Sequence, residues 1–342
     1  MKRIPVLIIV ILSSISCHNQ QGQNKETDIR MNAVCKIEEE PHLVGRALSL
    51  DVSNDGSFII SNGSEIMGYD ASGHQKYVLN RKGRGPYEYL VAKRVRRYDD
   101  TIYVWDSGSA RFLAYDLEGN GLWTFDYESA ICDFYPTESS IFIYPCGRKW
   151  DYLVEELDLE SLSITNSIGS SSMAQKAFHA MDAAVPLAVD RGTLYFMSRD
   201  KLDLYKCDLD HDDEPVVVER FHSDTFQCSD INEDELMNPI SGIQFTLQNS
   251  FVVTFAIDGD SYRLFTAEGS ADAGKIQPDG HMKVSNNTLV FRLYSPNEGG
   301  YKVAVCERTF DPQLISVRDG RIYALIDNPD DERFPYQLVT LE

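Results

Sequence analysis

Residues 101–125 read TIYVWDSGSARFLAYDLEGNGLWTF, a stretch in which short apolar runs alternate with turn residues. The runs at 101–105, 111–116 and 122–125 are rich in β-branched and aromatic residues and too short for ordinary helices, so each predicts a strand. Between the last two, the phrase Tyr115-Asp-Leu-Glu-Gly119 predicts a turn, because Asp favours the start of a turn and Gly adopts the positive φ that reverses the chain. The stretch therefore predicts antiparallel strands joined by tight turns.

The same pattern recurs along the rest of the chain. A polar or glycine-containing turn precedes a short apolar strand seven times, at 57–61, 101–105, 140–144, 193–197, 250–254, 288–292 and 321–325. The Tyr-Asp-x-x-Gly phrase also occurs at 69–73. This recurrence is typical of a repeat fold, and four antiparallel strands per repeat, arranged radially, predict an all-β propeller. A two-sheet sandwich is the alternative, but it does not explain the repeated turn. The one helical pattern, at 172–184, predicts an insertion on one face.

Composition and charge limit the classes of partner. The chain has 342 residues, of which 43% are hydrophobic and 25% charged, as in ordinary globular proteins. Its 32 Lys and Arg stand against 53 Asp and Glu, for a net charge of −21. Because nucleic-acid binding needs a basic surface, this balance argues against a nucleic-acid partner.

The N-terminus has the pattern of an export signal. Lys2 and Arg3 precede an apolar run at 4–12 and small residues at 13–16, so residues 1–16 predict a signal peptide. Cys17 follows directly, as the lipidated cysteine of a bacterial lipoprotein does; an ordinary signal peptide with an incidental cysteine is the alternative. We expect residues 17–40 to be the lipidated Cys and a flexible tether, and 41–342 a single propeller domain. The protein would then be exported and held at the outer membrane or facing the periplasm.

Export also bears on the cysteines, because disulfides persist in oxidising compartments. Residues 131–135 and 141–146 read as two strands of a hairpin centred near Ser139. Cys132 and Cys146 are equally far from that centre, so a disulfide between them is one interpretation. The other is a pair of buried thiols.

The phrase Gly83-Arg-Gly-Pro-Tyr-Glu88, preceded by Arg81-Lys82, carries a family resemblance. Together with Cys17 and the repeated turns, it resembles the TolB-like, NHL-like propeller lipoproteins of Gram-negative gut anaerobes. The motif residues are Gly83, Gly85, Pro86 and Glu88, whereas Tyr87 stands where that family often has Gly. The resemblance implies six blades, although seven strand pairs allow seven; a shared closing blade or a pair within an insertion would reconcile the counts. It implies no catalytic residues.

Residues 81–97 form a basic segment in an acidic chain. Seven basic residues stand against Glu88 alone: Arg81, Lys82, Arg84, Lys93, Arg94, Arg96 and Arg97. Strand alternation places Arg94 and Arg96 on one side and Arg97 on the other. All but Lys93 are candidate ligand-binding residues, since arginine at a propeller face or channel mouth can bind carboxylate or sulfate groups. Alternatively, they form salt bridges with acids of neighbouring blades.

Support for catalysis is weak. The histidines are scattered without a metal or triad motif, and the acidic run at 208–214 lacks the glycine and glutamate of a calcium loop. We expect no metal and no cofactor. The sequence therefore favours a lipid-anchored binding module for an envelope protein or glycan. The alternative is a propeller hydrolase or lyase acting on an anionic polysaccharide, which a tight cluster of Asp, Arg and His at the channel mouth would favour.

Overall fold

The structure is a computed structural model, and it describes most of the chain. The described residues are 27–38, 44–146, 151–178, 186–209, 214–238, 241, 244–245, 249–268, 275–276, 282–283, 290–298, 300–306, 310–328 and 335–342. The predicted signal peptide and Cys17 lie outside them, as do residues 210–213 of the acidic run.

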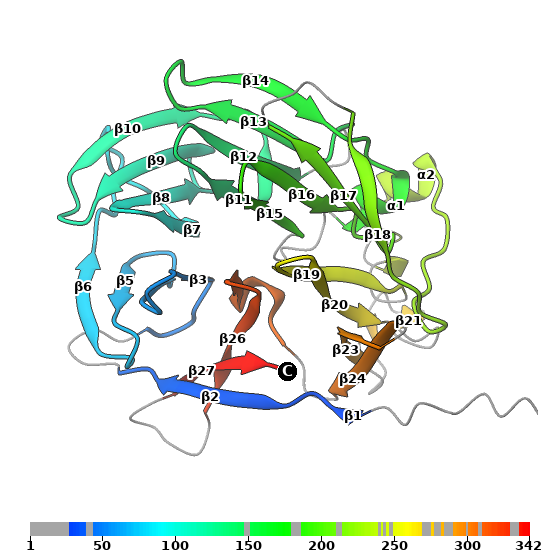
Figure 1. Ribbon diagram of the computed structural model, residues 1–342. Coiled ribbons are helices and arrows are strands. Elements are labelled where there is room, and N and C mark those ends of the chain that lie inside the picture. The colour runs from blue at the N-terminus through cyan, green and yellow to red at the C-terminus, as the bar shows by residue number, and fades with distance from the viewer. Residues whose placement is uncertain are drawn as a thin grey trace, which may run out of the picture.

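Six antiparallel sheets stand around a central axis as the blades of a propeller (Figure 1). From the innermost strand outward, the first three blades are β3 (Ser49–Val52), β4 (Phe58–Ser61), β5 (Ile66–Tyr69) and β6 (Gln75–Leu79); β7 (Ala92–Tyr98), β8 (Thr101–Asp106), β9 (Arg111–Asp116) and β10 (Gly121–Asp126); and β11 (Ala130–Pro136), β12 (Ser140–Cys146), β13 (Val154–Asp158) and β14 (Ser163–Ile168).

The other three blades have the same antiparallel order. The fourth is β15 (Leu187–Asp190), β16 (Thr193–Met197), β17 (Asp203–Asp208) and β18 (Val216–Arg220); the fifth is β19 (Phe251–Asp258), β20 (Ser261–Glu268), β23 (Val290–Asn297) and β24 (Gly300–Cys306); and the sixth is β25 (Ile315–Arg318), β26 (Arg321–Asp327), β27 (Tyr336–Leu341) and β2 (Met31–Lys36). A separate hairpin pairs β21 (Lys275–Ile276) with β22 (Met282–Lys283).

The structure confirms the all-β propeller and decides the blade count. Of the seven predicted strand pairs, those at 250–254 and 288–292 fall in one sheet, as its innermost strand β19 and its third strand β23. Seven blades are therefore wrong. The error arises because β20 and β23 are joined by a long connection, so one blade has the sequence spacing of two.

The predicted turns form as their residues require. Gly73 and Gly119 have φ of +86° and +82°, which closes the two Tyr-Asp-x-x-Gly turns. The Asp70 carboxylate accepts hydrogen bonds from the backbone N–H groups of Ser72 (2.9 Å) and His74 (3.1 Å), so the aspartate fixes the start of the turn.

The N-terminal segment closes the ring. β2 pairs antiparallel with β27 as the outer strand of the sixth blade, and β1 (Thr27–Asp28) pairs parallel with β24 at the edge of the fifth. The backbones of Arg30 and Glu342 exchange two hydrogen bonds of 2.8 and 2.9 Å. The expectation that 17–40 is all tether is therefore wrong for residues 27–38, because they supply a strand that the C-terminal blade lacks.

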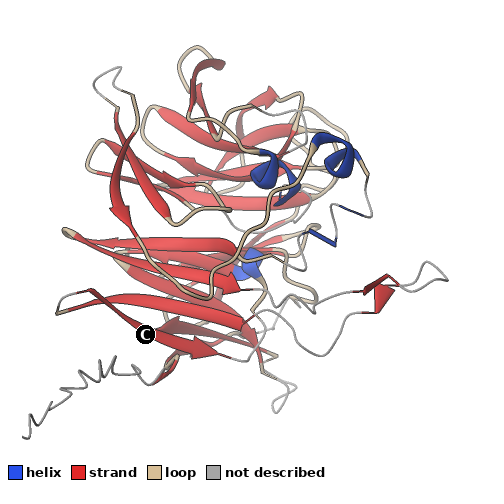
Figure 2. Ribbon diagram, turned by 90° about the vertical axis from the view of Figure 1, so that its right-hand side faces the viewer, coloured by secondary structure: helices blue, strands red, loops and turns tan. Residues whose placement is uncertain are grey.

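The helical elements lie together on one face of the disc, at the right in Figure 2. α1 (Met173–Phe178) confirms the start of the helical pattern at 172–184; its end, 179–184, lies outside the described residues. α2 (Glu233–Met237) and the 3₁₀ helix η1 (Pro312–Leu314) are also in connections that lead into an innermost strand. Within the described residues, no helix has the length and apolarity needed to cross a membrane.

The core lies between neighbouring blades and is rich in aromatic residues. Trp105 (2% exposed) packs against Phe112 and Tyr127, and Phe112 in turn meets Phe134 of the next blade, with ring centroids 5.2 Å apart. Edge-to-face contacts of this kind stabilise beyond the area they bury. The innermost strands contact one another around the ring, which surrounds the central channel.

Candidate functional site

The structure divides the basic segment into two groups. Arg81, Lys82 and Arg84 are exposed on the connection between the first and second blades. Arg81 donates through Nε to the carbonyl of Gly119 (3.1 Å), and Lys82 Nζ donates to Ser64 Oγ (3.0 Å). Arg94, Arg96 and Arg97 lie instead on β7, the innermost strand of the second blade. The six candidate residues therefore do not form one patch.

The Gly-x-Gly-Pro-x-Glu motif stabilises this connection by hydrogen bonds and close packing. The Glu88 carboxylate accepts a hydrogen bond from the Gly85 N–H (2.7 Å), and a Cβ at residue 83 would collide with that carboxylate. The Arg111 side chain donates to the carbonyls of Gly85 and Glu88. Tyr87 lies over Gly121 of β10, where a side chain would meet its ring. The motif thus holds the connection against the second blade.

Arg94 and Arg96 form a regular ladder at the channel. Arg94 donates from Nε to the carbonyl of Cys132 (2.9 Å) and from Nη1 to the carbonyl of Leu48 (3.0 Å). Arg96 repeats the pattern two residues on, to Phe134 (3.3 Å) and Leu50 (2.9 Å). Both side chains therefore link the first blade to the third. They donate to backbone carbonyls at the inner sheet edges, where no neighbouring strand among the described residues supplies a donor.

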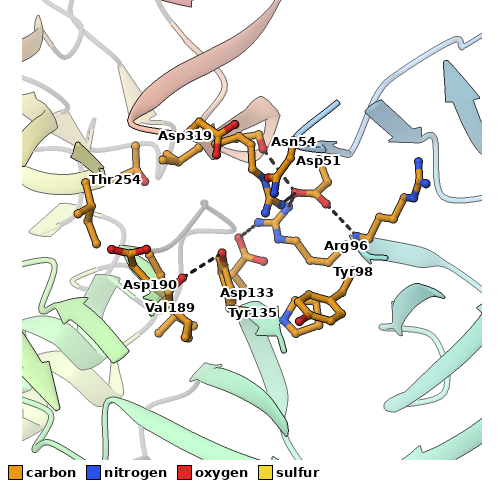
Figure 3. Close-up of a pocket in the computed structure, with 18 of the residues that line it drawn as sticks. Asp51, Asn54, Arg96, Tyr98, Asp133, Tyr135, Val189, Asp190, Thr254 and Asp319 are labelled. Carbon is orange, nitrogen blue, oxygen red and sulfur yellow. Dashed lines mark hydrogen bonds and ion pairs between the residues drawn. The ribbon is translucent and has the colours of Figure 1, made fainter. Parts of the chain in front are cut away.

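Arg96 also forms ion pairs with acids of the neighbouring blades. Its guanidinium lies 3.8 Å from the Asp51 carboxylate and in close contact with Asp133 (Figure 3). Arg318, from the sixth blade, lies 3.7 Å from Asp51. The predicted alternative, salt bridges to acids of other blades, is confirmed for Arg96, whereas Arg94 uses carbonyls.

Burial dominates the electrostatics of Asp51. Its side chain is 4% exposed, and burial raises the pKa of the carboxyl although Arg96, Arg318 and the Arg97 N–H act in the opposite direction. The Arg97 N–H donates to Asp51 Oδ2 at 2.8 Å. Asp51 is thus a buried carboxyl whose charge is only partly compensated.

These residues line a cavity of about 260 Å³ at one mouth of the channel, which we call the axial cavity. All six innermost strands contribute to its wall, through the ends that precede their turns. Charged side chains come mainly from the sixth, first, second and third blades, and the fourth and fifth supply the apolar Leu187, Val189 and Ile257. Figure 3 shows Val189 and Thr254 across the cavity from Asp51 and Arg96. The arginines therefore lie on one side, and the opposite side combines these apolar residues with Asp190 and Thr254.

The charges at the axial cavity nearly balance. Among the described lining residues, three arginines (Arg96, Arg97, Arg318) face four aspartates (Asp51, Asp133, Asp190, Asp319), and there is no histidine. Asp190 also pairs with the exposed Arg191, at 3.0 Å. The channel mouth thus has the Asp and Arg residues of the cluster that would favour an enzyme. Its described lining does not include the His. In the part of the chain that the structure describes, no three His, Cys, Asp or Glu side chains are grouped to hold a metal ion.

The hairpin that carries Cys132 and Cys146 forms, but its register differs from the expected one. Cys146 lies opposite Ala130, because a bulge between Ile131 and Asp133 shifts the pairing. The expectation that the two cysteines face each other is therefore wrong. Both are thiols in the structure, and both pack in the same apolar cluster.

Several lining residues are not among those predicted from the sequence: Asp51, Asp133, Asp190, Arg318 and Asp319. What these residues share in the sequence is their position relative to a turn, and not a motif. Asp51, Asp190 and Arg318 each come shortly before the turn that follows an innermost strand, at Asn54-Asp55-Gly56, Arg191-Gly192 and Asp319-Gly320. A charged residue repeated at that place marks the channel mouth.

Comparison with known proteins agrees with this fold. A profile of the family described as "6-bladed beta-propeller" matches residues 39–237. A candidate exported protein from Bacteroides fragilis is 12% identical, with a TM-score of 0.63 over 92% of this chain and 95% of that one. A member of the duf4221 family from Bacteroides vulgatus is also 12% identical, with a TM-score of 0.64 over 93% and 99%.

At such identity the two structures show a shared fold and nothing more. No curated protein sequence matches the chain. The family profile covers more than half of the chain, and the six sheets agree with its description. The chain therefore belongs to this family of six-bladed β-propellers.

Proposed function

We propose that the protein is an exported, lipid-anchored propeller that binds a small polar ligand in the axial cavity. The observation that carries the proposal is the cavity itself, a hollow of about 260 Å³ walled by all six innermost strands. It has a few converging polar groups and apolar lining residues, as ligand sites commonly do. Its volume lies just below the usual range for such sites, so the ligand or the part of it that enters is small.

The cellular setting is part of the proposal. Residues 1–16 have the pattern of a signal peptide and Cys17 that of a lipidation site, as in the TolB-like lipoproteins that the chain resembles. The partner would then be a glycan or protein of the cell envelope. Mass spectrometry of Cys17 from the membrane fraction tests the anchor, and Cys17→Ser should release the protein from the membrane. An unmodified Cys17 in membrane-bound protein would contradict lipidation.

The binding function is tested on the purified chain from residue 18 onward. We would screen glycan fragments, peptides and small polar metabolites by thermal shift, since a ligand that binds only the folded state raises the melting temperature. Arg318→Met removes a guanidinium that lines the cavity, and Arg321→Met changes an exposed arginine of the same blade. Binding that is weakened by the first variant and not by the second supports the proposal. Binding that is equal in both would place the ligand elsewhere.

A hydrolase or lyase acting on an anionic polysaccharide is the second proposal. The observation in its favour is Asp51, a buried carboxyl at the cavity whose raised pKa favours the protonated form that a general acid needs. Release of reducing ends or unsaturated sugars from polyuronates by the wild type, lost in Asp51→Asn with an unchanged melting temperature, would support catalysis. Absence of any product would leave the binding module.

A further inference from the structure

We infer that the ligand at the channel mouth is a neutral oligosaccharide of at least two sugar units, an inference that rests on the proposed binding function. It follows from a second cavity beside the first. This side cavity has a volume of about 230 Å³ and lies at the turns of the first and second blades, bordered by Ser53, Asp55 and Asp99. It shares Asn54, Arg97, Tyr98 and Arg318 with the axial cavity. Two adjoining hollows of similar size suit a chain of similar units.

The boundary between the two cavities offers hydrogen-bond donors. Arg97 donates from Nε to the carbonyl of Asp99 (2.8 Å) and from Nη1 to Ser57 Oγ (3.1 Å). Arg318 donates from Nε to the carbonyl of Val52 (2.8 Å). A guanidinium has five N–H donors, and these contacts, together with the contacts of Arg318 with Asp51 (3.7 Å) and Tyr135, use only part of the donor set of the two arginines. The remaining N–H groups are available to a ligand that spans both cavities.

Acceptors line the same two cavities as these donors. Asp51 and Asp133 lie in the axial cavity, Asp190 and Asp319 line it too, and Asp55 and Asp99 border the side cavity. A sugar hydroxyl donates and accepts at once, so a row of hydroxyls matches cavities lined by both carboxylates and guanidiniums. The apolar side chains of Leu187, Val189 and Ile257 suit the C–H face of a sugar ring.

The charge balance argues for a neutral chain rather than an acidic one. The described lining has a net charge of −1 at the axial cavity and zero at the side cavity, where Arg97 and Arg318 face Asp55 and Asp99. The whole protein carries −21. A polyanion would meet no net attraction here and would have to displace acids already paired with the arginines.

The same architecture argues against an extended peptide. A peptide that adds a strand needs an open sheet edge. The inner edges of β3 and β11 are occupied, because Arg94 and Arg96 donate to the carbonyls of residue 48, directly before β3, and of residues 50, 132 and 134. The Arg97 N–H likewise donates to Asp51, which occupies part of the β7 edge.

The test is calorimetric titration of the chain from residue 18 onward with neutral gluco-, manno- and galacto-oligosaccharides of increasing length, matched uronate oligomers and short peptides. Asp190→Ala removes a half-buried acceptor that lines the axial cavity and not the side cavity, and Ser53→Trp fills only the side cavity. Ser163→Trp, on the exposed outer strand β14, is the matched control.

We expect one neutral series to bind. The gain in affinity from one sugar unit to two should be about tenfold, which is the value of one added hydrogen bond. Ser53→Trp should abolish that gain and leave the single sugar unchanged, whereas Asp190→Ala should weaken both and Ser163→Trp neither. A single sugar that binds as tightly as its oligomers, or binding by uronates or peptides alone, would overturn this inference and leave the binding function standing. Binding by none of these probes, together with no hit in the wider screen, would overturn both.

Discussion

Replacing Arg94 with methionine should destabilise the ring more than any surface substitution, although Arg94 touches no ligand cavity. The side chain is 1% exposed and joins three other blades, through the carbonyls of Leu48 and Cys132 and the Oε1 atom of Gln313. Methionine fills most of the same space but donates no hydrogen bond.

The magnitude follows from the acceptors that would be left. Two backbone carbonyls in two blades each lose a donor from a charged group, at about 1.5–3 kcal/mol for each. Removing a buried guanidinium recovers part of its desolvation cost. We therefore expect the free energy of unfolding to fall by about 2–4 kcal/mol, a large share of the roughly 5–15 kcal/mol that stabilises a typical domain.

Urea unfolding, followed by tryptophan fluorescence, measures this difference from the midpoint and slope. Arg97→Met is the matched control, because Arg97 lies on the same strand but its side chain donates to groups at neighbouring turns, and the backbone bond to Asp51 is kept; we expect it to cost less than about 1 kcal/mol. Arg94→Lys keeps the charge but lacks the forked set of guanidinium donors, so we expect its free energy of unfolding to be close to that of Arg94→Met. A cost for Arg94→Met no greater than that for Arg97→Met would refute the ladder as the link between blades.

Further predictions concern Asp51, the Gly-x-Gly-Pro-x-Glu motif and ring closure. Because burial raises the Asp51 pKa in the folded state, the contribution of this carboxyl to stability should fall as pH rises above about 4. Asp51→Asn should therefore compare more favourably with wild type at pH 7 than at pH 4 in urea unfolding, and the opposite trend would show that the arginines outweigh burial. Gly83→Ala should cost about 1–3 kcal/mol by collision with Glu88, and a double-mutant cycle with Glu88→Ala should recover much of that cost; additive effects would contradict the clash. Deleting residues 18–36 removes β1 and β2 and exposes the edge of β27, so we expect a lower melting temperature and self-association in size-exclusion chromatography, whereas deleting 18–26 should change neither.

The sequence was sufficient for the fold because its strands and turns are local features. Apolar runs of four to six residues and turn residues such as Gly73 and Gly119 act within a few positions, so each can be identified without knowing its neighbours in space. The errors occurred where a distant partner decides. β2 belongs to the sixth blade only because β27 lies beside it, and the bulge at Ile131 that separates Cys132 from Cys146 leaves no mark in the spacing.

The candidate site was less predictable for the same reason. The charges of the basic segment are adjacent in sequence, which predicts one site. In the structure Arg81 lies on a connection outside the ring, whereas Arg96 faces the channel. The acids that meet Arg96 are Asp51 and Asp133, 45 and 37 residues away along the chain. Only the closed ring brings them together, so local charge density was a poor guide to the site.

Arg96 both links the blades and lines the axial cavity. Its guanidinium binds the carbonyls that connect three blades and also contacts two carboxylates of the axial cavity. A substitution at Arg96 therefore alters stability and ligand contacts together, whereas Arg94 affects stability alone and Asp190 or Asn54 affects the cavity alone. Changes in ligand preference are consequently least costly at the rim, where Asn54 is exposed and Asp190 pairs, among the described residues, only with the exposed Arg191 of its own turn. The alternation of a strand separates the two roles by two residues, so a propeller can vary its ligand while the ladder beneath the cavity stays constant.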